Sequence, residues 1–430
     1  MIRRTCLMLA AALALVSPAF ADYPRIAMIA TGGSQAYWDP AYQRELATAD
    51  IVILSVYPGW GSGRGTTMNT AIQQIKAINS NTKVFLYTLG ESLRMPAEAP
   101  WRSLADQITA NHWWLYQSGF SGTIVPSSHS TASYSINISS QSRKNSSGQN
   151  FPQWYGGWLA AQFGTPNPAA DGFFMDNVFW SPRKDGDWNG DGQIDSHTSS
   201  NARAWLRQGH VQELQALKRA MPNKLFIANA ADWGLPEAVI TEYEGQFNGA
   251  VFEGMVGRPF SQETWAGWDA MMKGYRKIMA AVAAPKYVIC VQAGSKTDYQ
   301  AMRYGLASCS LDNGYYMFSN IADSYHEVVH FDEYDADLGS PTSAPPTSPW
   351  QSGVYRRDFE RGIVLVNPKG NGSRTVNLGG EFVKLRGSQA PSANNGQTVT
   401  SVTLADRDGL FLLRKSPTPV PEGPSDFRVD

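Results

Sequence analysis

The sequence predicts a (β/α)8 barrel, an α/β fold, followed by a small antiparallel β domain. Eight short apolar runs, rich in β-branched and aromatic residues, recur through the first 320 residues, and helix-like stretches lie between most of them. Polar and apolar residues do not alternate within these runs, which is typical of parallel strands covered on both faces. An open doubly wound sheet is the alternative, but no glycine-rich dinucleotide-binding motif follows the first run.

The predicted strands and helices follow one another in βα order. The eight strand-like runs are residues 25–31, 50–57, 83–89, 172–177, 224–230, 249–255, 286–292 and 314–320. The clearest helical stretches between them are residues 67–79, 199–221 and 263–283. A very long connection, which contains a further helical stretch at 151–164, separates the third and fourth runs. Connections of that length are usually functional or mobile.

The domain boundaries follow from changes in composition. A Pro-, Ser- and Thr-rich stretch follows the eighth run, and short strands with turn residues between them come after it, without a strong helix. We predict a signal peptide at 1–21, the barrel at 22–337, a connection at 338–350, the β domain at 351–415 and a disordered tail at 416–430.

The first 21 residues have the pattern of a secretory signal peptide. Arg3 and Arg4 precede an apolar segment at 7–16, and a small-residue cleavage site ends at Ala21. The apolar segment is too short to span a bilayer, and no later segment is long enough. We therefore expect cleavage after Ala21 and export to the periplasm or the medium.

The net charge, the cysteines and the aromatic residues each indicate a property of the mature protein. Removing Arg3 and Arg4 with the signal peptide would take the net charge from −1 to −3, which argues against nucleic acid or an anionic membrane as partner. Cys290 and Cys309 would remain, either as a disulfide favoured by export or as two buried thiols. The 14 Trp and 18 Tyr residues supply core packing and also the rings on which sugars stack.

Two carboxylates end apolar runs at positions that a barrel brings to one mouth. Asp176 ends "FFMD" and Glu253 ends "AVFE". Burying an acid there costs several kcal/mol unless it is paired or functional. A carboxylate pair is what glycoside hydrolysis needs, one ionised and one able to protonate the leaving oxygen. Either acid alone could instead cap a helix or pair with a buried arginine.

Further residues near the predicted strand ends complete the expected site. Glu91 is the main competitor for a catalytic role, followed by Asp232 and Glu244. The six histidines show no zinc-ligand spacing. We expect substrate contacts from polar and aromatic side chains at the rim, namely Tyr57, Trp60, Glu91, Asn177, Trp180, Asn229, Asp232, Gln292 and Asn320.

The segment "DWNGDGQID" resembles a calcium-binding loop. Its residues at loop positions 1, 3, 5, 7 and 9 are Asp187, Asn189, Asp191, Gln193 and Asp195. Position 12 is Thr198, where the motif has a bidentate Glu, so the expected affinity is modest. A solvated turn rich in Asp and Asn is the alternative. A bound Ca²⁺ would have a structural role, and we expect no other cofactor.

An ordered set of segments resembles a known family. "DGFFMDNV", "NGDGQID", "GAVFEGM", "DEYDADLGSP" and "RGIVLVNP" are together similar to the bacterial proteins classed as hypothetical glycosyl hydrolase family 15, over roughly residues 25–370. That group is distantly related to the α-galactosidase and α-amylase barrels. The resemblance implies a (β/α)8 barrel with a C-terminal β domain. It also implies a nucleophilic Asp at Asp176 and an acid/base at Glu253, where those relatives commonly have Asp.

The sequence therefore predicts an exported glycoside hydrolase that cleaves a polysaccharide, by a retaining mechanism on the analogy with those barrels. A non-catalytic carbohydrate-binding or envelope-assembly protein on the same barrel is the alternative, because a fold does not prove an activity. An esterase or deacetylase is disfavoured because the chain has neither a G-x-S-x-G elbow nor a His-based metal site.

Overall fold

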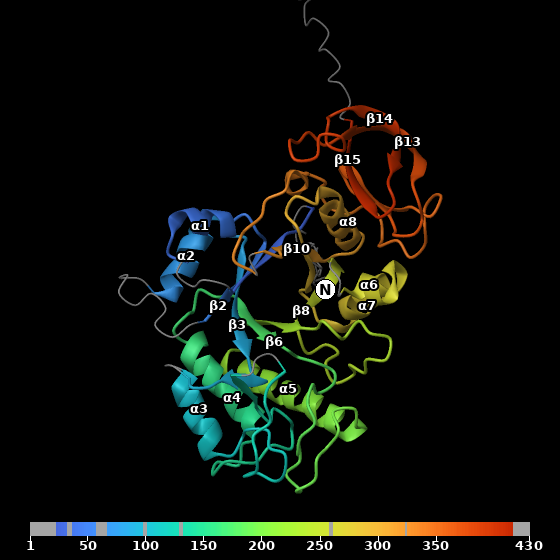
Figure 1. The fold of residues 1–430 in the computed structure, drawn as a ribbon. Helices are drawn as coiled ribbons and strands as arrows, with labels where there is room; N and C mark the ends of the chain where they lie inside the picture. Colours follow the sequence, from blue (N-terminus) through green and yellow to red (C-terminus); the bar gives the residue numbers. More distant parts are fainter. Residues whose placement is uncertain are drawn as a thin grey trace, which may run out of the picture.

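The computed structural model describes residues 23–31, 37–56, 67–97, 101–128, 132–257, 261–322 and 325–415. The predicted signal peptide and the predicted tail lie outside these residues. The main body is an eight-stranded parallel barrel, and a five-stranded antiparallel sheet forms a separate lobe at the C-terminal end of the chain (Figure 1). The predicted fold class is therefore confirmed.

The barrel sheet has the strand order β1-β2-β3-β6-β7-β8-β9-β10. A bridge between Ile26 and Tyr316, with the Tyr316 amide 2.8 Å from the Arg25 carbonyl oxygen, brings the first and last strands together. The strands are β1 (Ala27–Ala30), β2 (Ile51–Ser55), β3 (Lys83–Leu89), β6 (Gly172–Asp176), β7 (Leu225–Asn229), β8 (Gly249–Gly257), β9 (Tyr287–Gly294) and β10 (Tyr315–Asn320).

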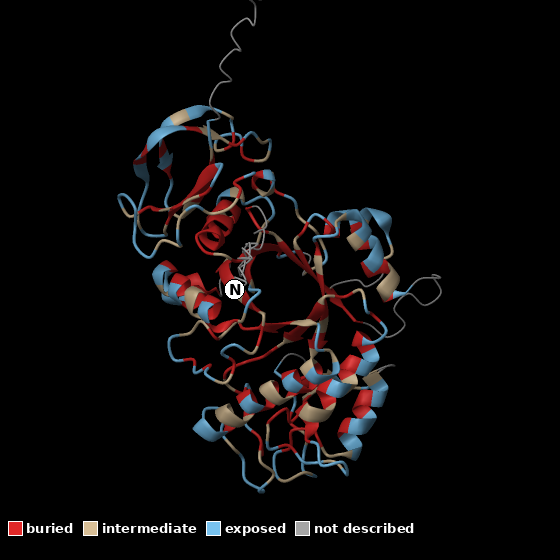
Figure 2. Cartoon of the chain, turned by 180° about the vertical axis from the view of Figure 1, so that it is seen from behind, coloured by how far each residue is buried: buried red, intermediate tan, exposed pale blue. Residues whose placement is uncertain are grey.

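Helices cover the outside of this barrel, and their inward faces and the strands are buried (Figure 2). Every residue of β1 and β2 is buried, as expected for strands packed on both faces. The α-helices are α1 (Pro40–Leu46), α2 (Met68–Ile78), α3 (Trp101–Ala110), α4 (Phe151–Leu159), α5 (Ser200–Ala220), α6 (Gln262–Ala266), α7 (Trp268–Ala281) and α8 (Tyr299–Ser310).

The helical stretch predicted at 263–283 is two helices rather than one. Gly267 has a φ of 83°, a left-handed conformation that favours glycine and that an α-helix cannot contain. The chain therefore turns between α6 and α7. The short helix α6 follows β8, which carries Glu253.

The long connection between β3 and β6 has structure of its own. It contains a two-stranded sheet, β4 (Ser92–Arg94) with β5 (Ser133–Ser135), as well as α3 and α4. A π-helical turn, Ala160–Gly164, extends α4. The Asn150 side chain and Gln153 form a reciprocal capping box at the start of α4, which fixes where that helix begins.

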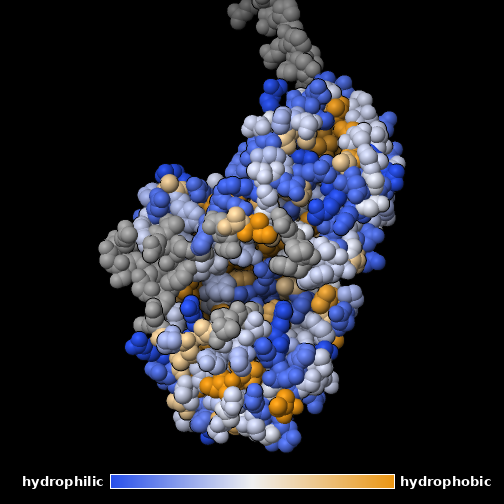
Figure 3. Space-filling model, viewed as in Figure 1, coloured by the Kyte–Doolittle hydropathy of each residue, from blue (hydrophilic) through white to orange (hydrophobic). Residues whose placement is uncertain are grey.

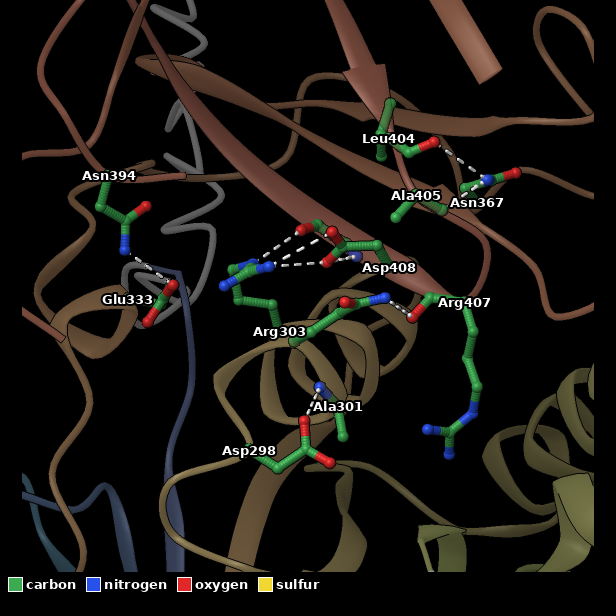
Figure 4. Close-up of polar contacts among 12 residues, drawn as sticks. Asp298, Ala301, Arg303, Glu333, Asn367, Asn394, Leu404, Ala405, Arg407 and Asp408 are labelled. Carbon is green, nitrogen blue, oxygen red and sulfur yellow. Dashed lines mark hydrogen bonds and ion pairs between the residues drawn. The ribbon is translucent and has the colours of Figure 1, made fainter. Parts of the chain in front are cut away.

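The C-terminal sheet has the strand order β11-β12-β15-β13-β14 and a small apolar core of its own. It docks on α8, where Arg303 forms an ion pair of 3.1 Å with Asp408 in the β14–β15 turn region (Figure 4). The strands are β11 (Tyr355–Asp358), β12 (Gly362–Asn367), β13 (Arg374–Lys384), β14 (Thr398–Leu404) and β15 (Asp408–Arg414). A 3-10 turn, Asp332–Asp335, lies between the two sheets in the chain.

The structure answers two questions that the sequence left open. Cys290 and Cys309 are both buried and form no disulfide bond, so they are two buried thiols, the second of the predicted alternatives. Of the helices in the described ranges, none has both the length and the apolar character needed to cross a bilayer.

Candidate active site

The amide of Asn229 links Asp176 and Glu253 at the carboxyl ends of three neighbouring strands. Its nitrogen Nδ2 is 2.7 Å from Asp176 Oδ1 and 3.0 Å from Glu253 Oε2, so the two oxygens can be no farther apart than the sum of these distances. The Asn229 oxygen accepts the backbone N–H of Ala231 at 3.1 Å, which orients the amide. The strand order β6-β7-β8 places the amide between the acids.

Three donors surround the Asp176 carboxylate. The Tyr87 hydroxyl donates to Oδ2, and the backbone N–H of Asn177, at 2.9 Å, joins Asn229 on Oδ1. Burial raises the pKa of Asp176 and the nearby Glu253 charge raises it further, whereas these donors lower it because they stabilise the ionised form. Asp176 is thus a half-buried carboxylate, and hydrogen bonds orient both of its oxygens.

Glu253 has a different environment on the other side of Asn229. The Tyr325 hydroxyl donates to its Oε1 at 2.7 Å. Burial and the neighbouring carboxylate raise the pKa of Tyr325 far above its usual value, so this hydroxyl stays protonated and remains a donor. The same causes raise the pKa of Tyr87 beside Asp176. Each acid therefore has one tyrosine donor of its own and shares one amide.

Glu91 lies beside the two acids and is linked to Asp176 through Asn177. It is buried, and its Oε2 accepts the side-chain N–H of Asn177 at 2.9 Å. Asn177 has a φ of 57°, in the left-handed region that Asn tolerates better than most residues, and its backbone N–H reaches Asp176. Glu91 therefore holds a residue that in turn contacts Asp176.

A cavity lies beside each of the two acids. One of about 920 Å³ is lined by Tyr87, Arg94 and Trp101, and Arg94 is the only charged residue among the described residues of its lining. The other, of about 620 Å³, is lined by Glu253 and Tyr325. Both volumes fall in the range of about 300–1,000 Å³ typical of ligand sites. Since Tyr87 bonds to Asp176, one cavity adjoins the Asp176 side of the pair and the other adjoins Glu253.

The 620 Å³ cavity also contains two of the residues predicted from the sequence. Trp180 is almost fully buried in its wall, with the Arg203 guanidinium 4.5 Å from its ring centroid. Asp232 accepts the Trp180 backbone N–H at 3.4 Å. Burial raises the pKa of Asp232 to about 7, although the nearby Arg183 charge opposes the shift.

Gln292 and Asn320 have internal partners instead. The Gln292 amide donates to the Ala301 carbonyl oxygen at 2.9 Å and accepts the Tyr316 hydroxyl at 2.7 Å. Asn320 donates to Glu327 at 2.6 Å. Neither residue lines the cavities beside the acid pair. The predicted substrate contacts Tyr57 and Trp60 lie outside the described residues.

Sequence reasoning did not identify Tyr87, Tyr325 or Trp265 as site residues. Tyr87 lies inside an apolar run, where an aromatic side chain is expected to be core. Tyr325 follows the last barrel strand in a stretch without any motif, and Trp265 lay within a predicted helix. Only for Tyr87 was there a sequence signal, namely its place two residues before the end of the third run.

The calcium-like loop bonds to itself in this conformation. Oδ1 of Asp187 accepts the backbone N–H groups of Gly190 and Asp191, and Oδ2 accepts that of Gly192. Asp195 accepts the Trp188 N–H at 3.0 Å. Among the described residues, no group of three or more His, Cys, Asp or Glu side chains is placed to hold a metal. Asp187, Asn189, Asp191 and Asp195 carry the oxygen ligands that calcium needs, and N–H bonds to a carboxylate do not exclude a cation, so the calcium site stays a prediction.

Calcium in excess is expected to raise the melting temperature of the protein by at least about 2 °C relative to EDTA, because a cation that binds only the folded loop stabilises the folded state. Differential scanning calorimetry with calcium, magnesium or EDTA measures this directly. Equal melting temperatures under all three conditions would contradict the calcium site.

Comparison with solved structures supports the barrel. The chain is similar to Eubacterium rectale Amy13B, with a TM-score of 0.55, 8% identity and coverage of 93% of this chain and 97% of that one. It also matches the glycoside hydrolase domain of PelA from Pseudomonas aeruginosa, with a TM-score of 0.42, 13% identity and coverage of 71% and 97%. At such identities the likeness to Amy13B shows the fold alone.

A third match is an uncharacterized protein from Listeria monocytogenes EGD-e in complex with glucose, magnesium and calcium. The TM-score is 0.49 and the identity 9%, with coverage of 91% of this chain. This chain spans only 41% of the length of that protein. Comparison with curated protein sequences gives no match.

The family comparison covers most of the barrel and the start of the β domain. The family model described as "Hypothetical glycosyl hydrolase family 15" matches residues 76–363, well over half of the 430 residues. This range includes Asp176, Asn229 and Glu253. The predicted resemblance is thereby confirmed, and the chain belongs to hypothetical glycosyl hydrolase family 15.

Proposed function

We propose that the protein is an exported glycoside hydrolase that cleaves a polysaccharide by a retaining mechanism. The observation that carries this proposal is the contact of Asn229 with both Asp176 and Glu253 through one nitrogen. Two carboxyl groups this close match the spacing of about 5–5.5 Å in retaining glycosidases, and they are closer than the about 6.5–9.5 Å needed to place a water molecule in inverting ones.

The proposed roles follow from the surroundings of each acid. Asp176 attacks the anomeric carbon as nucleophile, because three donors stabilise its ionised form. Glu253 faces a cavity and protonates the leaving glycosidic oxygen; it then takes a proton from the water that hydrolyses the glycosyl–enzyme ester. Tyr87, Tyr325 and Asn229 hold the two carboxyl groups in place during both steps.

A cavity beside each acid supports a polymeric substrate. A sugar chain that crosses the pair would place units in the Tyr87 cavity and in the Glu253 cavity at once. The face of the molecule drawn in Figure 3 is mainly hydrophilic with separate hydrophobic patches. Export rests on the signal-peptide pattern of residues 1–21.

The test is reducing-end release from a panel of bacterial and plant polysaccharides, α-linked ones included. We expect the wild-type protein to release reducing ends from at least one of them, and the folded double variant Asp176→Asn/Glu253→Gln to release none. Melting temperatures of both proteins check that folding is intact. Binding of a glycan without hydrolysis by the wild type would overturn the proposal in favour of a carbohydrate-binding protein.

A further inference from the structure

Trp265 is an exposed aromatic ring in the wall of the Glu253 cavity. It is 63% exposed, the highest value among the large hydrophobic side chains of the described ranges, and it lines the same cavity as Glu253 and Tyr325. A large apolar ring in water loses the free energy that burial would give it. Exposed apolar side chains in a groove beside polar groups are typical of binding sites.

The helix that carries Trp265 is firmly held. The Ser261 side chain caps α6 by accepting the Thr264 N–H at 3.1 Å. Gln262 reaches back to the barrel and donates to the Ala231 carbonyl oxygen, which follows β7, at 2.9 Å. Trp265 is therefore exposed on an ordered element, and fraying of a chain end does not explain its exposure.

The C-terminal β domain supplies the third attachment. Arg407, in the turn between β14 and β15, binds Glu263 of α6 with Nη2 2.8 Å from Oε2 and Nε 3.1 Å from the same oxygen. Glu263 is 3% exposed, and the ring of Tyr304 lies 5.0 Å below the guanidinium. In Figure 4, Arg407 extends away from the neighbouring Arg303–Asp408 pair. The β domain is thus bound both to α8 and to α6, and α6 carries Trp265 in the wall of the Glu253 cavity.

We propose that Trp265 is the stacking platform of a sugar subsite on the Glu253 side of the cleft, and that Arg407 of the β domain holds this platform in place. The apolar face of a pyranose ring is the ligand chemistry that an exposed indole beside a glycosidase-like carboxylate would take. This inference rests on the proposed function and adds to it a specific binding position.

The first experiment compares Trp265→Ala with a matched control, Trp350→Ala. Trp350 is 40% exposed and stacks with Arg356 at 4.8 Å, in the region of the β domain and away from both cavities. On the glycan cleaved in the panel, Trp265→Ala is expected to raise KM for long oligosaccharides about 5- to 10-fold, the size of one aromatic contact. Short oligosaccharides and kcat should change little, and Trp350→Ala should match the wild type.

A binding measurement distinguishes the proposed sugar subsite from the proposed hydrolase activity. Calorimetric titration of the same panel polysaccharides into the wild type and both Trp variants needs no hydrolysis. Weaker binding by Trp265→Ala alone, without any hydrolysis by the wild type, would support the subsite and overturn the hydrolase. Equal binding and equal KM in all three proteins, with hydrolysis intact, would overturn the subsite and leave the hydrolase standing. Absence of both binding and hydrolysis across the panel would overturn both.

The second experiment tests Arg407 as a positioning residue. Arg407→Met is expected to raise KM for long oligosaccharides as Trp265→Ala does, with kcat nearly unchanged, whereas Arg407→Lys should restore part of the loss because it keeps the charge. Arg414→Met is the control, since Arg414 pairs with Asp358 inside the β domain at 2.9 Å. A defect in Trp265→Ala together with wild-type length dependence in Arg407→Met would show that the platform does not depend on the β domain. If the Met variant does not fold, Arg407→Gln, which also removes the charge, takes its place.

Discussion

Replacing Asp176 with Ala is expected to lower kcat by at least about 10⁴-fold, the order of loss that follows removal of a nucleophile. Asp176 is the acid with three donors, so its removal takes away the attacking group and leaves Tyr87 and Asn229 with an unfilled space between them. Kinetics on the glycan identified in the panel measure the loss, with the melting temperature as a check on folding.

Chemical rescue by azide tests whether Asp176 acts by covalent catalysis. The small anion fits the space that Asp176→Ala opens, and it is expected to restore activity and to give a glycosyl azide of the anomeric configuration opposite to the substrate. Azide rescue in Glu253→Ala that gives the opposite anomer, with no rescue in Asp176→Ala, would exchange the two roles.

In the wild type, activity should fall as the pH falls through the raised pKa of Asp176, at a pH above the usual aspartate value of about 3.9.

Glu253→Gln is expected to lower kcat about 10²- to 10⁴-fold on a natural glycan, the usual contribution of general acid–base catalysis. Glutamine keeps the shape of the side chain and can still bond to Tyr325 and Asn229, but it cannot donate a proton to the leaving oxygen. The loss should shrink for an aryl glycoside with an acidic phenol, because that leaving group departs without protonation.

The measurement is a comparison of kcat/KM for the two substrate types in Glu253→Gln and in the wild type. Asp232→Asn is the informative companion, because Asp232 lines the same cavity and burial raises its pKa to about 7. If Asp232→Asn shows the leaving-group dependence and Glu253→Gln does not, Asp232 is the acid. Loss of activity on both substrates to the same extent in Glu253→Gln would contradict a role in proton transfer.

The strands of this barrel were predictable because most of their residues are apolar and buried. The run "IVIL" at the start of β2 is apolar at every position, which is typical of a strand packed on both faces. Asp176 and Glu253 could be found for the same reason, since an acid at the end of such a run is conspicuous. The break at Gly267 was harder to predict because glycine occurs in helices at a modest cost, and only the observed φ of 83° excludes a continuous helix.

The links between residues could not be predicted from the order of the chain. Asn229 was expected to contact substrate, and its contact with two acids depends on the register of three strands. Tyr325 reaches Glu253 across 72 positions, and no local pattern encodes that distance. The same limit applies to the calcium-like loop. Its spacing fits a motif, but the bonds of its backbone N–H groups to Asp187 depend on the loop conformation, which the sequence alone does not reveal.

The Arg407–Glu263 pair has a consequence for where this protein can be divided. The family match ends at residue 363, inside β12, whereas the guanidinium that neutralises Glu263 comes from residue 407. A fragment cut at the end of the match would leave Glu263 and Arg303 on the barrel surface without their counter-charges. The transferable module for chimeras with other barrels therefore extends through β15, because the last strand and the turn before it carry the ion pairs that join the β domain to the barrel.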